Sequence, residues 1–152
     1  MASYSKQMQR IVADYRISGE PWPASTKTIA AWAIGNGKWE LPQSAALTKC
    51  AEDISRAMRE EYTTDAQGRR VRVKHPTTVR RGSEQLVLWD DLRTATREHM
   101  KLSFQQRRQQ IVGDCRQLKI DVDSYNDRHA NVEPIQMVFD FVRDLAEIEA
   151  AA

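Results

Sequence analysis

The densest group of cations in this sequence lies between residues 69 and 81. Six Lys and Arg residues fall within these 13 positions, and no Asp or Glu interrupts them. Guanidinium groups fork onto phosphate oxygens, and neutralising phosphates releases condensed counterions, so such a run favours a nucleic acid. A solvated hairpin with no ligand is the alternative. The predicted phosphate contacts are Arg69, Arg70, Arg72, Lys74, Arg80 and Arg81.

The net charge is distributed unevenly along the chain. Residues 1–82 hold 14 Lys and Arg against 8 Asp and Glu, a balance of +6. Residues 83–152 hold 9 against 13, a balance of −4, and the two add to the +2 of the whole chain. The first part is therefore where we expect an anionic partner to bind.

Other chemistry has little support. The sequence contains no Gly-x-Ser-x-Gly motif and no phosphate-binding glycine loop. Asp121 and Asp123 begin like a calcium loop, but Tyr125 occupies the third ligand position. The three histidines lack the spacing of zinc ligands. We therefore expect no catalysis, no cofactor and no metal, with a hydrolase that uses carboxylates of residues 114–127 left open as an alternative.

Hydrophobic periodicity predicts helices early in the chain. The first spans residues 5–18. The second follows a cap at Ser25 or Thr26 and stops at residues 35–37, and the third begins at Pro42. The face of the third helix opposite its apolar stripe carries mixed charge, including Lys49, Glu52, Asp53, Arg56, Arg59 and Glu60.

The pattern then changes from helical to alternating. Residues 61–64 and 69–75 are predicted to be two strands around a turn at residues 65–68, and Pro76 is predicted to end the second strand. Residues 77–82 have the composition of a linker, so we predict a domain boundary at residue 82.

Two helices are predicted in the C-terminal part. The first starts at about residue 84 and carries apolar residues at alternating spacings of 4 and 3, namely Ile111, Cys115, Leu118, Val122 and Tyr125. The second spans residues 134–151 with a matching seam. We expect them to form an antiparallel hairpin. Because the first helix is the longer, it leaves apolar surface for a second copy, and we expect a homodimer.

Three helices followed by a basic hairpin resemble a winged helix-turn-helix domain over residues 5–81. Ala31 and Gly35 are four residues apart at the end of the second helix, as the small residue and turn glycine are in many such units. The resemblance implies that the third helix enters the major groove and that the wing lies on the backbone or in a minor groove. Its predicted contacts are Ser44, Lys49, Arg56 and Arg59.

The sequence therefore predicts a mainly α protein. A winged-helix-like domain, residues 1–82, precedes a long antiparallel helical hairpin, residues 83–152. The expected function is DNA binding, in preference to RNA, by a transcriptional or phage-type regulator. The rival is a protein–protein adaptor that uses its long C-terminal helices. Glu52 and Asp53 favour the adaptor because they repel phosphates, whereas the acid-free basic run favours nucleic acid.

Two further expectations concern compartment and core. No secretory signal or apolar stretch of membrane-spanning length is visible, which predicts a cytoplasmic location. Cys50 and Cys115 are expected to be reduced thiols in the core. The four tryptophans are expected in core or helix-end positions and not as base-stacking platforms.

Overall fold

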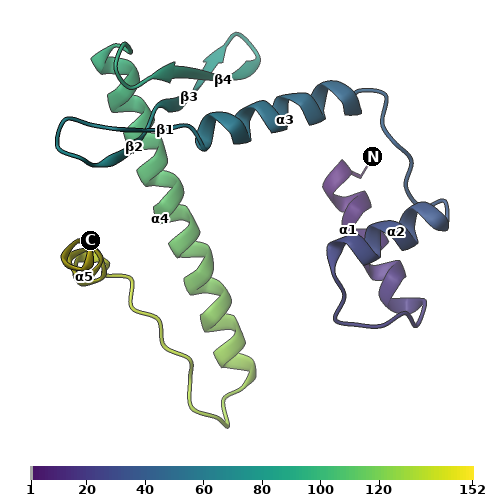
Figure 1. Ribbon diagram of the computed structural model, residues 1–152. Coiled ribbons are helices and arrows are strands. Elements are labelled where there is room, and N and C mark those ends of the chain that lie inside the picture. The colour runs from purple at the N-terminus through teal and green to yellow at the C-terminus, as the bar shows by residue number, and fades with distance from the viewer. Residues whose placement is uncertain (1) are drawn as a thin grey trace. The chain divides into compact units, whose positions relative to one another are not determined.

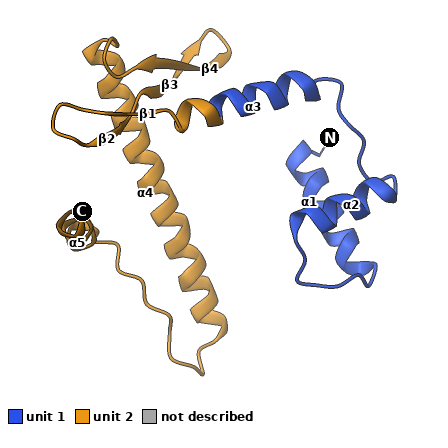
Figure 2. Ribbon diagram, in the orientation of Figure 1, with its two compact units in different colours: residues 1–55 blue, residues 56–152 orange. Residues whose placement is uncertain are grey.

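The computed structural model describes residues 2–152 (Figure 1). The chain divides into two compact units, Met1–Ser55 (unit 1) and Arg56–Ala152 (unit 2) (Figure 2). The mainly helical class is confirmed. The elements of the described residues are α1 (Tyr4–Ile17), α2 (Thr26–Gly35), α3 (Ala45–Arg59), β1 (Tyr62–Thr64), β2 (Arg70–Arg72), β3 (Lys74–Arg81), β4 (Glu84–Asp91), α4 (Arg97–Arg128) and α5 (Val142–Ala151). No described helix combines the length and the apolar character needed to cross a membrane.

Unit 1 is built around Tyr15 of α1, which is 1% exposed. Its ring meets the Trp32 ring of α2 edge-on, with centroids 5.5 Å apart, and its hydroxyl donates to the carbonyl of Pro21 over 2.9 Å. Ser3 and Ser25 cap the two helices, each side chain accepting a backbone N–H from the first turn. The predictions of these two helices and of the Ser25 cap are confirmed.

The third helix, α3, begins at Ala45 instead of Pro42, and none of its residues is buried. Leu47 and Ile54 of its apolar stripe are exposed. Cys50 is exposed as well, so the prediction of a core thiol there is wrong. The helix forms as predicted, but within the described residues its apolar face buries nothing.

Unit 2 begins with two antiparallel hairpins. β1 pairs with β2, with Thr63 opposite Val71, and β3 pairs with β4 along its whole length, with Thr77 opposite Leu88. Val73, which is 3% exposed, joins the hairpins. The β1–β2 hairpin and its turn at residues 65–68 confirm the predicted strand, turn and strand, although the second strand is shorter than predicted.

Val73 lies between the two strand pairings and makes a backbone hydrogen bond next to each of them. Its N–H donates to the carbonyl of Glu61 over 3.0 Å, and its carbonyl accepts the N–H of Leu92 over 2.7 Å. The first bond extends the β1–β2 pairing and the second extends the β3–β4 pairing. Val73, at the bend between β2 and β3, therefore links the two hairpins through its backbone hydrogen bonds.

Two sequence predictions fail in the second hairpin. Residues 77–82 are not a linker, because β3 continues through Pro76 to Arg81 and Gly82 lies in the turn to β4. The predicted boundary at residue 82 therefore falls inside unit 2, and the units divide between Ser55 and Arg56. Gly82 has φ +64, which suits a two-residue hairpin turn that needs glycine first. Residues 84–91 are a strand and not the start of a helix.

Polar side chains of α4 dock this helix on the open edge of β3. The Gln106 side-chain amide donates to the Thr78 carbonyl and accepts the Thr78 N–H, each over 2.8 Å. Ser103, the one buried residue of α4, donates its hydroxyl to the Pro76 carbonyl over 2.7 Å. Pro76 is tolerated in the strand because β3 is an edge strand, where the missing N–H has no strand partner. The side chains of α4 thus take the place of a third strand.

Two histidines complete the contact between α4 and β3. The Nε2 of His99 donates to the carbonyl of His75 over 2.9 Å. The buried ring of His75 in turn donates from Nε2 to the carbonyl of Arg72, 2.9 Å away, and meets the Phe104 ring edge-on. The interior of unit 2 is consequently polar: its buried residues are Val73, His75, Thr77 and Ser103.

Both C-terminal helices begin later than predicted. α4 begins at Arg97, after a Thr96 cap whose hydroxyl accepts the His99 N–H, and not at residue 84. It ends at Arg128. α5 starts at Val142, so residues 134–141 are not helical and half of the seam predicted for the last helix is absent. The prediction of two matched antiparallel helices is therefore wrong, because the second one is too short.

We expect Gln106→Ala to lower the free energy of unfolding by about 1–3 kcal/mol, because it leaves a backbone N–H and a carbonyl of Thr78 without partners. Gln109→Ala, on an exposed part of the same helix, is the control and should change it by less than about 0.5 kcal/mol. Urea unfolding followed by circular dichroism measures both. Equal effects of the two substitutions would contradict the docking role of Gln106.

Candidate nucleic-acid interface

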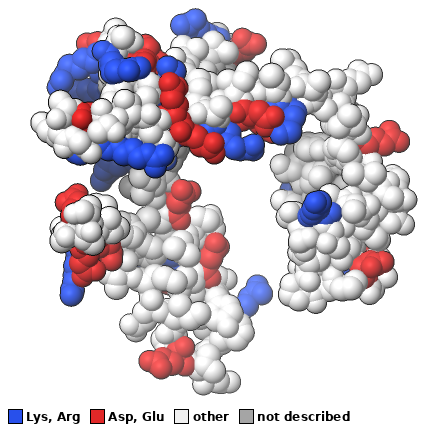
Figure 3. Space-filling view, in the orientation of Figure 1, with Lys and Arg blue, Asp and Glu red and all other residues white. Residues whose placement is uncertain are grey.

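The predicted basic run lies on the strands of unit 2. Arg69 belongs to the turn before β2, Arg70 and Arg72 to β2, and Lys74, Arg80 and Arg81 to β3. Figure 3 shows Lys and Arg side chains over the strands of this unit, with acidic side chains among them. The structure therefore keeps the predicted cations on adjoining strands but mixes carboxylates into the same surface.

Carboxylates from neighbouring segments pair with part of the run. Arg69 Nε lies 2.8 Å from an Asp65 carboxylate oxygen across the turn. Lys74 Nζ lies 3.6 Å from a carboxylate oxygen of Asp91 and 3.8 Å from one of Glu61. Sequence reasoning missed these acids because strand pairing, and not sequence proximity, brings residues 61 and 91 beside the run.

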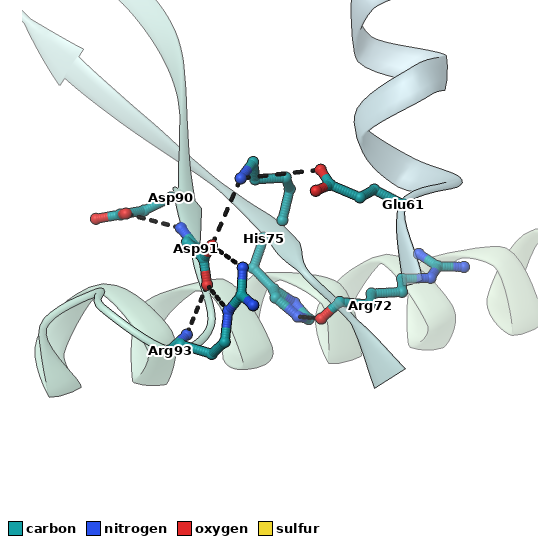
Figure 4. A network of polar contacts seen from close by, with 7 residues as sticks. Glu61, Arg72, His75, Asp90, Asp91 and Arg93 are labelled. Atoms are coloured by element: carbon teal, nitrogen blue, oxygen red, sulfur yellow. Dashed lines mark hydrogen bonds and ion pairs between the residues drawn. The ribbon is translucent and has the colours of Figure 1, made fainter. Parts of the chain in front are cut away.

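Asp91 is the centre of a charged network (Figure 4). Its carboxylate accepts the guanidinium N–H groups of Arg93, over 3.0 and 2.8 Å, and the Arg93 backbone N–H over 2.8 Å. These bonds, the guanidinium ones first, hold the pKa of Asp91 far below its usual range, and the carboxylate raises the pKa of Arg93. The pKa of Asp65 is lowered in the same way, first by the backbone N–H of Arg69 and then by its guanidinium.

A pocket of about 220 Å³ opens between the β3–β4 hairpin and α4, and we call it the hairpin groove. Four cations line it: Arg59, Arg72, Lys74 and Arg107. The Trp89 side chain lines it too, with the Arg59 guanidinium 5.5 Å from the ring centroid. None of the described residues that line the groove is acidic. Its electrostatics therefore suit an anion.

Strand alternation explains which side chains reach the groove. Successive side chains of a strand point to opposite faces, so Lys74, Thr78 and Arg80 share one face of β3. Trp89 of β4 is paired with Pro76 on that same face. From the other side, Gln106, Arg107 and Gln110 of α4 line the groove. The face that carries Lys74 and Arg80 is thus continuous with the groove.

Several of these cations form no ion pair with an Asp or Glu of the described chain. Within residues 2–152 the ion pairs do not include Arg72, Arg80, Arg81 or Arg107. Arg80 and Arg81 are exposed at the far end of β3. Arg70 differs, because its guanidinium lies 4.0 Å from the centroid of the Tyr62 ring. The cations best able to bind a phosphate are therefore Arg72 and Arg107 in the groove and Arg80 beyond it, because Arg81 lies on the opposite face of β3 and across from Glu84.

The residues predicted on α3 are not brought together. Ser44 and Lys49 belong to unit 1, and Lys49 Nζ lies 2.6 Å from an Asp53 carboxylate oxygen. Arg56 belongs to unit 2 and has an interaction partner of its own. Arg59, at the end of α3, joins the groove. One of the four predicted α3 contacts thus lies with the cations of the strands.

Among the groove residues that were not predicted from the sequence are Trp89, Arg107 and Gln110. Trp89 was expected in a core position, but it is only partly buried. Arg107 and Gln110 belong to the segment Gln105–Gln110, which reads Gln-Gln-Arg-Arg-Gln-Gln and is the signal that could have found them. A helix segment with two cations, four amides and no acid is an unusual surface for a chain with this many carboxylates.

The polar cluster at the end of α4 is held by contacts within the chain. Lys119 Nζ lies 2.6 Å from an Asp123 carboxylate oxygen. The Asn126 side chain accepts the N–H of Ile135 and donates to its carbonyl. In the part of the chain that the structure describes, no three His, Cys, Asp or Glu side chains are grouped so as to hold a metal. The two thiols are free.

Comparison of the chain with known protein families, curated proteins and solved structures finds no match. Its function is therefore inferred from the residues and geometry of the chain itself.

The lowered pKa of Asp91 predicts how stability depends on pH. A carboxylate whose pKa falls on folding stabilises the folded state above its unfolded pKa of about 3.9, and that contribution is lost as the pH falls further. Asp91→Asn should therefore have a lower free energy of unfolding than the native protein at about pH 7. This difference in free energy should become smaller as the pH falls toward about 2.

Urea unfolding at several pH values measures this difference. Asp127→Asn, which removes an exposed carboxylate of α4, is the matched control and should leave the pH dependence of stability unchanged. A constant difference between the native protein and Asp91→Asn at all pH values would show that the Asp91 network does not couple stability to protonation.

Proposed function

We propose that this protein binds nucleic acid, without catalysis, through the hairpin groove and the adjoining face of β3. The observation that carries the proposal is the groove itself, which is lined by four cations and the Trp89 ring and by no acidic residue. Nucleic acids present closely spaced phosphates together with flat bases, and this groove offers partners for both.

Phosphates are the ligand that the cations fit best. Arg72 and Arg107 have no competing carboxylate in the described chain, and guanidinium groups bind phosphate oxygens bidentately. Arg80 lies further along the same face of β3, so a backbone that crosses the groove can continue over it, whereas Arg81 points to the opposite face of the strand. In this proposal β3 and β4 act as the wing of a winged-helix-like protein, and DNA is the expected ligand in preference to RNA.

Bases are the ligand that the ring and amides fit. A base can stack on Trp89 or on the guanidinium plane of Arg59. Gln110 can donate and accept at a base edge, whereas the Gln106 amide is already bound to the Thr78 backbone. The helix closest to the bases is then α4 and not α3. A role in transcriptional or phage-type regulation is the biological setting that we propose for this binding.

We expect Arg72→Gln combined with Arg107→Gln to weaken binding to duplex DNA and to lower the slope of log K against log salt by about 2, which is about 1 for each phosphate that is no longer neutralised. Fluorescence anisotropy with a labelled duplex at several salt concentrations measures the slope. Arg143→Gln is the matched control, because that exposed arginine lies on α5 and pairs with Glu147.

The same titration can refute the proposal. Affinity that is independent of salt, or a double variant with the slope of the native protein, would mean that the groove does not bind phosphates. A single-stranded RNA of the same length, tested in parallel, decides between the two nucleic acids.

Trp89 provides a second test. If a base stacks on its ring, Trp89→Leu should weaken binding of a single-stranded oligonucleotide by about 1–3 kcal/mol, a factor of roughly 5 to 150. The control is Trp22→Leu, since Trp22 is also partly exposed but lies in unit 1 under the Arg16 guanidinium. Equal affinities of Trp89→Leu and the native protein would remove base stacking from the proposal and leave phosphate binding intact.

A further inference from the structure

The C-terminal half of α4 carries an apolar seam that the described chain leaves largely exposed. α4 is docked on β3 only near its start, where Ser103 is its one buried residue. Further along, Ile111 is 52% exposed, Leu118 44% and Tyr125 48%, while Cys115 and Val122 are partly buried. A long helix with an exposed apolar stripe is poorly stabilised in water. We therefore expect another surface to pack against this seam.

The seam has the pattern of a two-stranded coiled coil. Its spacings of 4, 3, 4 and 3 place Ile111, Leu118 and Tyr125 at the d positions of a heptad and Cys115 and Val122 at the a positions. A β-branched residue at a together with leucine at d favours two parallel strands. Val122 and Leu118 provide this combination. The seam is thus suited to a second helix with the same repeat.

We propose that the partner is a second copy of this chain, aligned in parallel and in register over residues 111–125 of α4. The flanking charges support this occupant. In a parallel pair each g position faces the e position five residues further along on the other helix, so Asp114 faces Lys119 of the second copy. By symmetry this ion pair forms twice, once on each side of the seam.

The same charges disfavour an antiparallel pair. In that arrangement g positions face g positions, and here both central g residues, Asp114 and Asp121, are acidic. Acidic residues would then face each other across the seam on one side. The parallel arrangement instead pairs opposite charges. It also places the two hairpin grooves at the same end of the coiled coil, because each groove is built on the start of α4.

Disulfide cross-linking through Cys115 tests the parallel, in-register arrangement. At an a position of a parallel in-register pair, the two copies of one residue face each other across the axis, within the range that a disulfide can bridge. We expect mild oxidation of the Cys50→Ser full-length protein to give a disulfide-linked dimer of twice 17.5 kDa. Cys115→Ser, which keeps the exposed Cys50, is the control and should remain predominantly a single chain on non-reducing gels.

The ion pair has its own test, a mixture of Asp114→Lys and Lys119→Asp chains that both carry Cys50→Ser. Each variant alone places like charges across the seam, whereas the mixed dimer restores two opposite-charge pairs. After the disulfides have equilibrated in a redox buffer, the fraction of mixed dimers should therefore be higher than random pairing of the two chains would give. Effects within one helix, such as removal of the ion pair between Lys119 and Asp123, are the same in both kinds of dimer and cancel.

Three results would overturn the proposal. The first is a mass of one chain by light scattering at tens of micromolar, well above the dissociation constants of stable dimers. The second is a dimeric mass without Cys115 cross-linking, which would mean another register or another face. The third is random pairing in the mixture. None of these results depends on nucleic-acid binding, so this proposal and the proposed function can fail separately.

Discussion

The contact between α4 and the open edge of β3 determines the rest of unit 2. Gln106 satisfies both backbone groups of Thr78, and Ser103 binds the Pro76 carbonyl. A two-stranded sheet has two open edges, and an exposed edge invites pairing with another chain. Here the helix covers one edge with polar side chains. The groove exists because this docking holds α4 beside the face that carries Trp89 and Arg72.

The hydrogen bonds of this contact explain how a small polar interior can fix the position of α4 on β3. Burial of apolar surface is strong but non-directional, whereas hydrogen bonds fix distance and angle. A shift of α4 by one residue would leave the amide of Gln106 and the backbone of Thr78 without their partners. The interior of unit 2 therefore specifies one register of helix on strand, although Val73 is its only buried aliphatic residue among those described.

Much of the N-terminal half was predictable because its signals are local. Ser25 before α2 and the turn at residues 65–68 act on their immediate neighbours, and both were predicted correctly. The β3–β4 hairpin was not predicted because its local sequence favours other structures. Pro76 usually ends a strand, and the leucines of residues 84–91 also fit a helical spacing. Only the pairing partner and the covering helix make this segment a strand.

In the candidate site too, features that depend on neighbouring residues were predictable, and features that depend on distant residues were not. The six cations of the basic run could be read from the sequence, since they adjoin one another. The carboxylates of Glu61 and Asp91 beside Lys74 could not, because a strand ladder brings them there. Arg107 and Trp89 join the groove only through the docking of α4. Sequence therefore predicted where the positive charge lies but not which cations are neutralised.

The junction at Val73 between the two hairpins also affects how unit 2 can fold. Each hairpin pairs residues that are close in sequence, and the bonds from α4 to β3 span at most 28 residues. Low sequence separation keeps the entropy of loop closure small and makes folding fast. Once residues 61–110 have left the ribosome, every partner of Val73 and of the β3 edge is present. The hairpins and the start of α4 can then fold before α5 has left the ribosome.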